Sequence, residues 1–252
     1  MNIGIVIPAR LKSTRLKEKM LINIDGEPLI RYMFDRVRTM GYDTYVVTDS
    51  KKIAQHITNE NVIMSNKAEN GTARIASVLD KLKQYDIIIN IQGDMVDMDV
   101  WHLRTITDRC KQGFDYMLTA YTESYEPNGV KCIHQEGKAL WFTRKDIGYG
   151  DRHVGIYAYK PELLRSYDLF HDQYPEENLE QNRILGYYDS MSIKNTAIIQ
   201  IPSDVSRKTR ITTIAHEISH YWEEMYCDLE SRKSEKFANK MENDYYQSIS
   251  RN

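Results

Sequence analysis

The sequence predicts an α/β fold, with a mostly parallel central sheet flanked by helices. Short apolar runs alternate with segments of helical periodicity along the first 110 residues, an order typical of parallel strands joined by helical crossovers. The run Asp86–Ile91 contains four isoleucines, the composition of a strand covered on both faces. With 252 residues, 41% hydrophobic and 28% charged, the chain can bury a sizeable core as a soluble globular protein.

The first half supplies the alternating elements of the predicted sheet. The expected strands are Ile3–Ile7, Asp43–Thr48 and Asp86–Ile91. The expected helices are Leu29–Met40, Lys51–Ile57, Thr72–Gln84 and Val100–Cys110. Pro28 opens the first helix, because a proline suits the start of a helix, where its missing N–H is no loss.

The second half predicts more strands in closer succession, followed by a charged tail. The expected strands are Tyr116–Tyr121, Val130–His134, Ala139–Thr143, His153–Tyr159 and Thr196–Ile201, and the expected helices are Pro161–Phe170 and Glu177–Tyr187. From Thr209 onward the pattern is helical and rich in charge. We therefore expect an α/β unit at 1–205 and a helical C-terminal tail at 206–252.

Charge and cysteine content exclude several classes of protein. The net charge of −2 argues against a broad polycationic nucleic-acid binder. No run of about 18 apolar residues exists, so no membrane span and no membrane partner are expected. The three cysteines are scattered and form no CxxC pair, which suggests reduced thiols and a cytoplasmic location.

A basic loop follows the first predicted strand. Five cations fall within ten residues, and Ser13 and Thr14 lie between them: Arg10, Lys12, Arg15, Lys17 and Lys19. Ligands of open parallel sheets bind beyond the carboxyl ends of the strands, and a polyphosphate needs several cationic donors. The loop lacks the glycines and the GK[ST] of a Walker A motif. It predicts a phosphate site, the alternative being a solvated basic loop.

The strand Asp86–Ile91 runs into Gln92-Gly93-Asp94. An aspartate at this edge can hold Mg²⁺ on phosphate oxygens, because Mg²⁺ prefers one or two carboxylates together with phosphates and waters. Gly93 would allow a close approach of the backbone. The alternative is a turn in which Asp94 only caps the following segment.

Together these stretches resemble the CMP-sugar synthetases, and among them the 3-deoxy-manno-octulosonate (Kdo) cytidylyltransferases. The pattern PAR-x-x-S-T-R-L-x-x-K-x-L is present as Pro8–Leu21, and N-[VI]-Q-G-D as Asn90–Asp94. Seven further family patterns occur in family order: Ile24–Ile30, Val47–Asp49, Asn70–Arg74, Pro127–Lys131, Ala139–Arg144, His153–Tyr159 and Leu179–Leu185. The resemblance covers about residues 2–205.

The resemblance implies a nucleotide-diphospho-sugar transferase fold, which is Rossmann-like, and a homodimer. It also implies Mg²⁺-dependent transfer of CMP from CTP to a 2-keto acid sugar, with release of pyrophosphate. By the same resemblance the nucleotide would be bound by Arg10, Ser13, Arg15, Lys19, Asn70, Thr72, Arg74 and Gln92. Lys19, Arg15 and Asp94 would be catalytic, Asp94 would also bind Mg²⁺, and the sugar acid would face His153, Glu180 and Gln181. The alternative for His153 is a strand histidine whose hydrogen bonds are satisfied by the backbone. The alternative for Glu180 and Gln181 is a position on a solvated helix face.

Three departures from the family pattern bear on this assignment. Lys17-Glu18 stands where the family has Pro-Gly, so the loop loses a glycine. The stretch from Arg144 to His153 is shorter than in the family, which leaves the identity of the acceptor sugar open. The family's V-D-T-P-E-D-L, which would supply a second metal carboxylate, is missing, and only Asp204 stands near that place.

The tail contains an HExxH pattern. On a helix His216 and His220 share one face and could bind Zn²⁺, with Glu217 as general base. The third ligand would come from Asp228, Glu230, Glu235 or Glu242. The alternative is an amphipathic helix that packs on the catalytic unit. The sequence thus favours a cytidylyltransferase, with two alternatives: a zinc-peptidase-like tail on a degenerate scaffold, and a non-catalytic nucleotide- or sugar-binding protein.

Overall fold

A computed structural model describes residues 1–12, 16–96, 98, 100–170, 177, 179–190 and 196–200. In this part of the chain nine strands form one sheet in the order β5-β4-β1-β6-β10-β7-β11-β9-β8. The strands are β1 Ile3–Ala9, β2 Asn23–Ile24, β3 Glu27–Pro28, β4 Asp43–Thr48, β5 Val62–Met64, β6 Ile87–Ile91, β7 Met117–Thr122, β8 Lys131–Gln135, β9 Lys138–Thr143, β10 Asp151–Tyr159 and β11 Thr196–Gln200. The helices are α1 Leu29–Arg38, α2 Lys51–Ala54, α3 Gly71–Ala76, α4 Val100–Gln112, α5 Pro161–Arg165 and α6 Glu180–Ser190.

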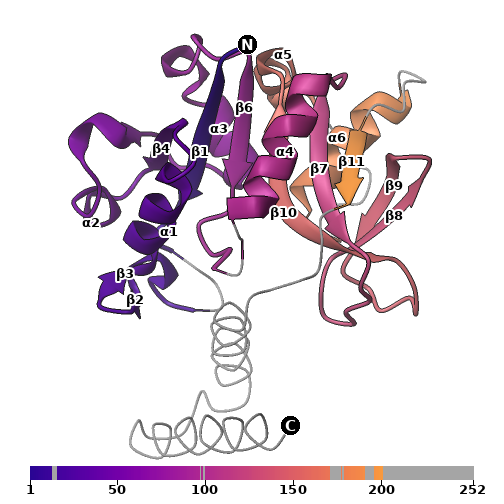
Figure 1. Ribbon diagram of the computed structural model, residues 1–252, viewed down its shortest axis with the longest axis horizontal. Helices are drawn as coiled ribbons and strands as arrows, with labels where there is room; N and C mark the ends of the chain where they lie inside the picture. Colours follow the sequence, from indigo (N-terminus) through magenta and orange to yellow (C-terminus); the bar gives the residue numbers. More distant parts are fainter. Residues whose placement is uncertain are drawn as a thin grey trace, which may run out of the picture.

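Strand direction confirms the predicted mostly parallel sheet. β1 pairs in parallel with β4 and β6, β4 with β5, and β7 with β11. β10 is antiparallel to β6 and β7, and β9 is antiparallel to β8 and β11. Of the nine strands that the structure describes in this sheet, only β9 and β10 therefore run against the rest. In Figure 1 the β8–β9 hairpin lies at one end of the sheet and β4 lies near the other, where β5 is the edge strand.

Helices cover both faces of the sheet, as predicted. On one face Ile5 and Ile7 of β1 belong to a core cluster with residues of α1 and α4, such as Phe34 and Ile106. On the other face Val6 belongs to a cluster with residues of α3, α5 and α6. The alternation along β1, with all seven residues buried, is what a doubly covered strand requires. Figure 1 shows α4 lying across the sheet near its centre.

The predicted helix Thr72–Gln84 is wrong in its length. α3 ends at Ala76, and a 3-10 helix at Leu79–Lys81 follows. At this point the Ser77 hydroxyl donates to the carbonyl of Arg74 at 2.8 Å, and Val78 N donates to Ile75 O. Such a local serine bond competes with the helical pattern. The apolar spacing continues through both segments, which is why the periodicity suggested one helix.

The predicted helix Pro161–Phe170 is likewise divided, into α5 and a 3-10 helix at Tyr167–Leu169. Two features were missed: strand β5 and the small β2–β3 hairpin, which turns through Gly26 at φ +94°. Both involve strands of two or three residues, too short to show a period of two. Strand β4 matches its prediction residue for residue.

Two expectations concern regions beyond the sheet. No helix among the described residues is long and apolar enough to cross a membrane. The predicted boundary between residues 205 and 206 and the helical tail at 206–252 lie outside the described residues.

Candidate functional site

The candidate site lies where β1 and β6 end. From β1 the chain proceeds to β4 and β5 on one side, and then returns to β6 on the other side of β1. This change of direction is the topological switch point of an open α/β sheet, where ligands bind beyond the carboxyl ends of the strands. Arg10 follows β1 directly and is exposed, and Gln92-Gly93-Asp94 follows β6. Both stretches thus follow strands, and the structure shows that these two strands are neighbours in the sheet.

Lys19 and Asp94 form an ion pair at this edge. The Lys19 Nζ lies 2.8 Å from Asp94 Oδ2. The Lys19 side chain is 10% exposed and that of Asp94 is 39% exposed, so the carboxylate faces solvent while the ammonium lies beneath it. We call Arg10, Lys19 and Asp94 the open wall of the site.

Gly93 brings the two turns of the open wall together. A Cβ on Gly93 would lie 2.8 Å from Sδ of Met20, the residue next to Lys19. The glycine therefore lets the turn after β6 approach the 3-10 helix Lys19–Leu21 closely. Glu18, which stands where the family has glycine, has φ 53° and ψ 35°. The backbone thus keeps the left-handed conformation although a side chain is present.

The N-terminus of α3 forms the next part of the site. Asn70 caps it: its Oδ1 accepts from Ala73 N at 2.8 Å, and its Nδ2 donates to the Tyr167 hydroxyl at 3.0 Å. Thr72 is buried, and its hydroxyl lies 2.7 Å from that of Tyr159. These polar groups are therefore held in place before any ligand binds.

Arg74 points away from solvent. It is 3% exposed, donates to Ser65 Oγ at 2.7 Å, and lies 3.3 Å from Asp49 Oδ1. Its contacts connect α3 to the ends of β4 and β5. This geometry favours a supporting position behind the nucleotide residues.

Glu180 at the start of α6 connects α3 to β6. Its Oε2 accepts from Thr72 N at 2.9 Å, and its Oε1 accepts from Gln92 Nε2 at 3.0 Å. Burial raises the pKa of Glu180, although the hydrogen bonds from Thr72, Gly71 and Gln92 act in the opposite direction. The structure thus brings a residue expected on the sugar side into contact with two expected on the nucleotide side.

His153 on β10 is buried and neutral. Its ring packs edge-on against Phe142, with centroids 4.8 Å apart. Burial, and to a lesser extent the positive charge of Arg144, lowers the pKa of His153 to about 3. The Thr119 hydroxyl donates to Ile156 O at 2.8 Å, so it accepts from His153 Nε2 at 2.9 Å. The proton therefore sits on Nε2, and Nδ1 is an acceptor.

Gln181 and its neighbour Asn182 anchor α6 against the sheet. Gln181 is 2% exposed, and its Oε1 accepts from the Tyr157 hydroxyl at 3.3 Å. Asn182 bonds both backbone groups of Phe142: Oδ1 accepts from its N–H at 3.2 Å and Nδ2 donates to its carbonyl at 2.8 Å. We call Thr72, His153, Glu180 and Gln181 the packed wall of the site.

Sequence analysis missed Glu177 and Arg144. Glu177 is 4% exposed and accepts from Thr143 Oγ1 at 2.6 Å and from Arg144 N at 2.9 Å. Burial acts to raise the pKa of Glu177, but these bonds and Lys145 outweigh it, and the pKa is lowered. Glu177 therefore holds the end of β9, which places Arg144 near His153. The sequence signal for Arg144 was the charged pair Arg144-Lys145, which directly follows the expected strand Ala139–Thr143.

Several predicted site residues lie outside the described residues. They are Ser13, Arg15, Asp204, His216, Glu217 and His220. They include the histidines of the HExxH pattern and the candidate second metal carboxylate. Among the described residues no group of three or more His, Cys, Asp or Glu side chains could hold a metal ion. Asp94 is a partly exposed carboxylate beside Lys19, a cation of the kind that binds phosphate. A single carboxylate of this kind fits Mg²⁺ that is ligated mainly by substrate phosphates and water.

Comparison with known proteins gives consistent matches. The profile of a family described as cytidylyltransferase matches residues 4–205. A 3-deoxy-manno-octulosonate cytidylyltransferase of Francisella tularensis subsp. novicida is 33% identical over 226 residues, covering 78% of this chain and 90% of that protein. The protein of the same name from Fusobacterium nucleatum is 32% identical over 202 residues, covering 71% and 82%.

Solved structures agree. A CMP:2-keto-3-deoxy-manno-octonic acid synthetase complexed with CTP superposes with a TM-score of 0.72 at 25% identity, covering 88% of this chain and all of that one. A glucose-1-phosphate thymidylyltransferase from Bacillus anthracis, described as putative, gives a TM-score of 0.63 at 13% identity and shows the fold alone.

Proposed function

This chain belongs to the cytidylyltransferase family, and we propose that it transfers CMP from CTP to the anomeric hydroxyl of a Kdo-like 2-keto acid sugar. One observation carries the proposal beyond family membership: the Lys19–Asp94 pair stands at the switch point of the sheet, where a triphosphate would lie. The reaction is an in-line attack of the hydroxyl oxygen on the α-phosphorus. The hydroxyl O–H bond and the P–O bond to the β-phosphate break, the proton passes to solvent, and pyrophosphate leaves.

The open wall would bind the triphosphate. Lys19 and Arg10, with Ser13 and Arg15 from the same loop, would neutralise and orient the phosphates. Lys19 is held beneath Asp94 by their 2.8 Å contact, so its ammonium is positioned before CTP arrives. Such preorganisation lowers the barrier because no cation has to be ordered in the transition state.

Asp94 would hold Mg²⁺ on the phosphates. When bound, the ion supplies positive charge that draws electron density from the phosphoryl oxygens and stabilises the leaving pyrophosphate. Asp94 exposes 39% of its side chain, so its carboxylate can be reached by an ion from the solvent. Asp204 remains our candidate for a second carboxylate.

The packed wall would position both substrates. Asn70, Thr72 and Gln92 would contact the nucleotide, with Arg74 supporting them from behind. Glu180 and Gln181 would orient the hydroxyls of the sugar acid. A histidine that stays neutral down to about pH 3 is a poor general base. We therefore assign His153 an orienting role, in which Nδ1 accepts a hydrogen bond from a sugar hydroxyl.

Arg144 is our candidate partner for the sugar carboxylate. Its charge is close enough to His153 to act on the pKa of that ring, and a guanidinium matches a carboxylate in two-point geometry. We also expect the enzyme to act as a homodimer, which light scattering of the purified protein would measure.

The test is a pyrophosphate-release assay. The purified enzyme is incubated with Mg²⁺, CTP and each of several 2-keto acid sugars, and separately with ATP, GTP or UTP in place of CTP. Release is expected only with CTP and an acceptor together. CTP binding by calorimetry without turnover of any acceptor would instead support a non-catalytic binding protein. Loss of release in a chelator, with recovery on adding Mg²⁺, would establish the metal dependence.

A further inference from the structure

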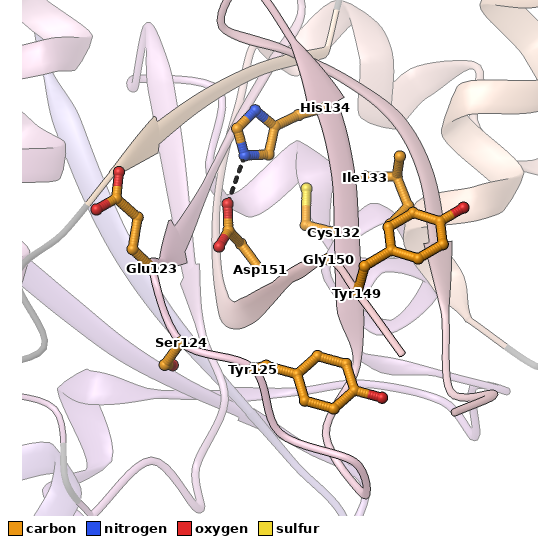
Figure 2. A pocket seen from close by; sticks show the side chains of 9 residues that line it. All are labelled: Glu123, Ser124, Tyr125, Cys132, Ile133, His134, Tyr149, Gly150 and Asp151. Carbon is orange, nitrogen blue, oxygen red and sulfur yellow. Dashed lines mark hydrogen bonds and ion pairs between the residues drawn. The ribbon is translucent and has the colours of Figure 1, made fainter. Parts of the chain in front are cut away.

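A second hollow lies beside the packed wall. Its volume is about 580 Å³, within the range of pockets that bind small molecules. Glu123 from the end of β7, His134 from β8, and Tyr149 and Asp151 before and at the start of β10 line it. Figure 2 shows His134 directed at Asp151, and His134 Nε2 lies 2.8 Å from Asp151 Oδ2.

The pocket is acidic. Its nine lining residues include the carboxylates of Glu123 and Asp151 and no lysine or arginine. Within the part of the chain that the structure describes, Glu123 has no ion-pair partner. The nearby cations are engaged elsewhere: Lys131 donates to the carbonyls of Pro127 and Arg144, and Arg152 pairs with Glu126 at 2.9 Å. The pocket is therefore unsuited to a phosphate or a carboxylate.

The pocket begins where the expected sugar-acid site ends. Asp151 precedes His153 by two residues on β10, a distance of about 7 Å along a strand. Tyr121 pairs with His153 across the β7–β10 ladder, and its ring lies 4.3 Å from that of His134. An acceptor that touches His153 and extends about 7 Å along the strand would reach the pocket that Asp151 and Glu123 line.

The short connection between β9 and β10 leaves this pocket open. Only Arg144–Gly150 separates the two strands, and Tyr149 in this segment is 61% exposed. An exposed tyrosine at the rim offers a ring face to a sugar or to a cation. The rim therefore adds an aromatic surface to the two carboxylates.

From this arrangement we propose that the acceptor carries a positively charged amino group at the end of its chain remote from the carboxylate, and that this pocket binds it. The inference rests on the proposed function. The keto acid end meets Arg144 and His153, and the ammonium end lies between Glu123 and the Asp151–His134 pair. The protein thus offers the carboxylates of Glu123 and Asp151 at one end and the guanidinium of Arg144 at the other. These opposite charges fix the direction in which the sugar binds.

The experiment compares two acceptors that differ only at the carbon most remote from the carboxylate, one with a hydroxyl and one with a primary amine. Pyrophosphate release gives kcat/KM for each. The wild-type enzyme is expected to prefer the amine by about tenfold. Glu123→Gln should reduce this preference by about fivefold, the effect of removing one partly exposed charge. Glu136→Gln, in the exposed β8–β9 turn, is the matched control.

The outcomes separate the two proposals. Equal turnover of both acceptors, preference for the hydroxyl, or a preference that Glu123→Gln leaves intact would overturn the amino-sugar inference while the transferase proposal stands. Absence of turnover with both acceptors and with the panel of keto acid sugars would overturn both. Glu123 is exposed and makes no ion pair in the described chain, so its variant tests the pocket even where Asp151→Asn fails to fold.

Discussion

The two walls of the site hold their polar groups in different ways. On the open wall, Asp94 exposes 39% of its side chain and contacts Lys19 at 2.8 Å. On the packed wall, His153 and Gln181 are 8% and 2% exposed, and each bonds a buried partner. Groups near solvent can exchange water for phosphate and metal at little cost, whereas buried groups must be satisfied at all times. The walls should therefore fail differently when mutated.

The largest expected effect is on the open wall. Asp94→Asn should lower kcat by about a hundredfold, or about 2.7 kcal/mol in the barrier, because the amide keeps the shape but loses the charge that holds the metal. The free energy of unfolding in urea should change by less than about 1 kcal/mol, since the side chain is partly exposed. Turnover within threefold of wild type at saturating Mg²⁺ would show that Asp94 is not the metal carboxylate.

The packed wall should instead make stability depend on pH. An unfolded histidine titrates near 6.5, and in the fold the pKa of His153 is about 3. Below pH 6.5 the unfolded chain therefore binds a proton that the folded chain does not. Stability from this residue is fully present above pH 6.5 and falls as the pH drops toward 3, by up to about 1.4 kcal/mol per pH unit.

Urea unfolding between pH 4.5 and 7.5 measures this dependence. His153→Gln keeps an N–H donor for Thr119 and cannot titrate. The difference in the free energy of unfolding between wild type and variant should therefore shrink with decreasing pH. Two parallel curves would show that His153 is hydrated and protonates normally in the folded state.

The sequence predicts the fold well because the signals are long and repeated. β1, β4 and β6 are strands of seven, six and five residues, rich in Ile, Val and Thr, and their order determines the switch point. β5 and the β2–β3 hairpin are too short to show periodicity. The division of the predicted Thr72–Gln84 helix depends on one serine bond that no spacing reveals.

The site could be predicted only in part. Asp94 and Lys19 follow from their positions at strand ends and in the basic loop. The contacts of Glu180 with Thr72 and Gln92 join residues 108 and 88 positions apart, and a sequence pattern does not show which side chains meet at such separation. Glu177 was missed for the same reason, because its partners Thr143 and Arg144 lie on another element.

A smaller effect, on CTP binding, should separate the contribution of Lys19 from that of the other lysines in the loop. Lys19→Met is expected to weaken CTP binding by more than about tenfold, or about 1.4 kcal/mol, because the ammonium held beneath Asp94 is lost. Lys17→Met, an exposed lysine two residues earlier, is the matched control and should weaken binding by less than about threefold. Calorimetry at fixed salt measures both. Equal losses would indicate that the loop acts only through its total charge.

The smallest expected effect concerns the backbone of the open wall, at Glu18. Its φ of 53° is strained for a residue with a side chain, by about 1 kcal/mol or more. Glu18→Gly should relieve this strain, but it also removes the exposed ion pair with Lys52 at 3.2 Å. Glu18→Gln removes the same pair and keeps the strain, so the difference between the two variants isolates the backbone. After the entropy that glycine adds to the unfolded chain, Glu18→Gly should be the more stable of the two by about 0.5–1 kcal/mol in urea unfolding. If Glu18→Gln is equally stable, the strain is relaxed in solution, and the turn that carries Lys19 is not held in the conformation that pairs it with Asp94.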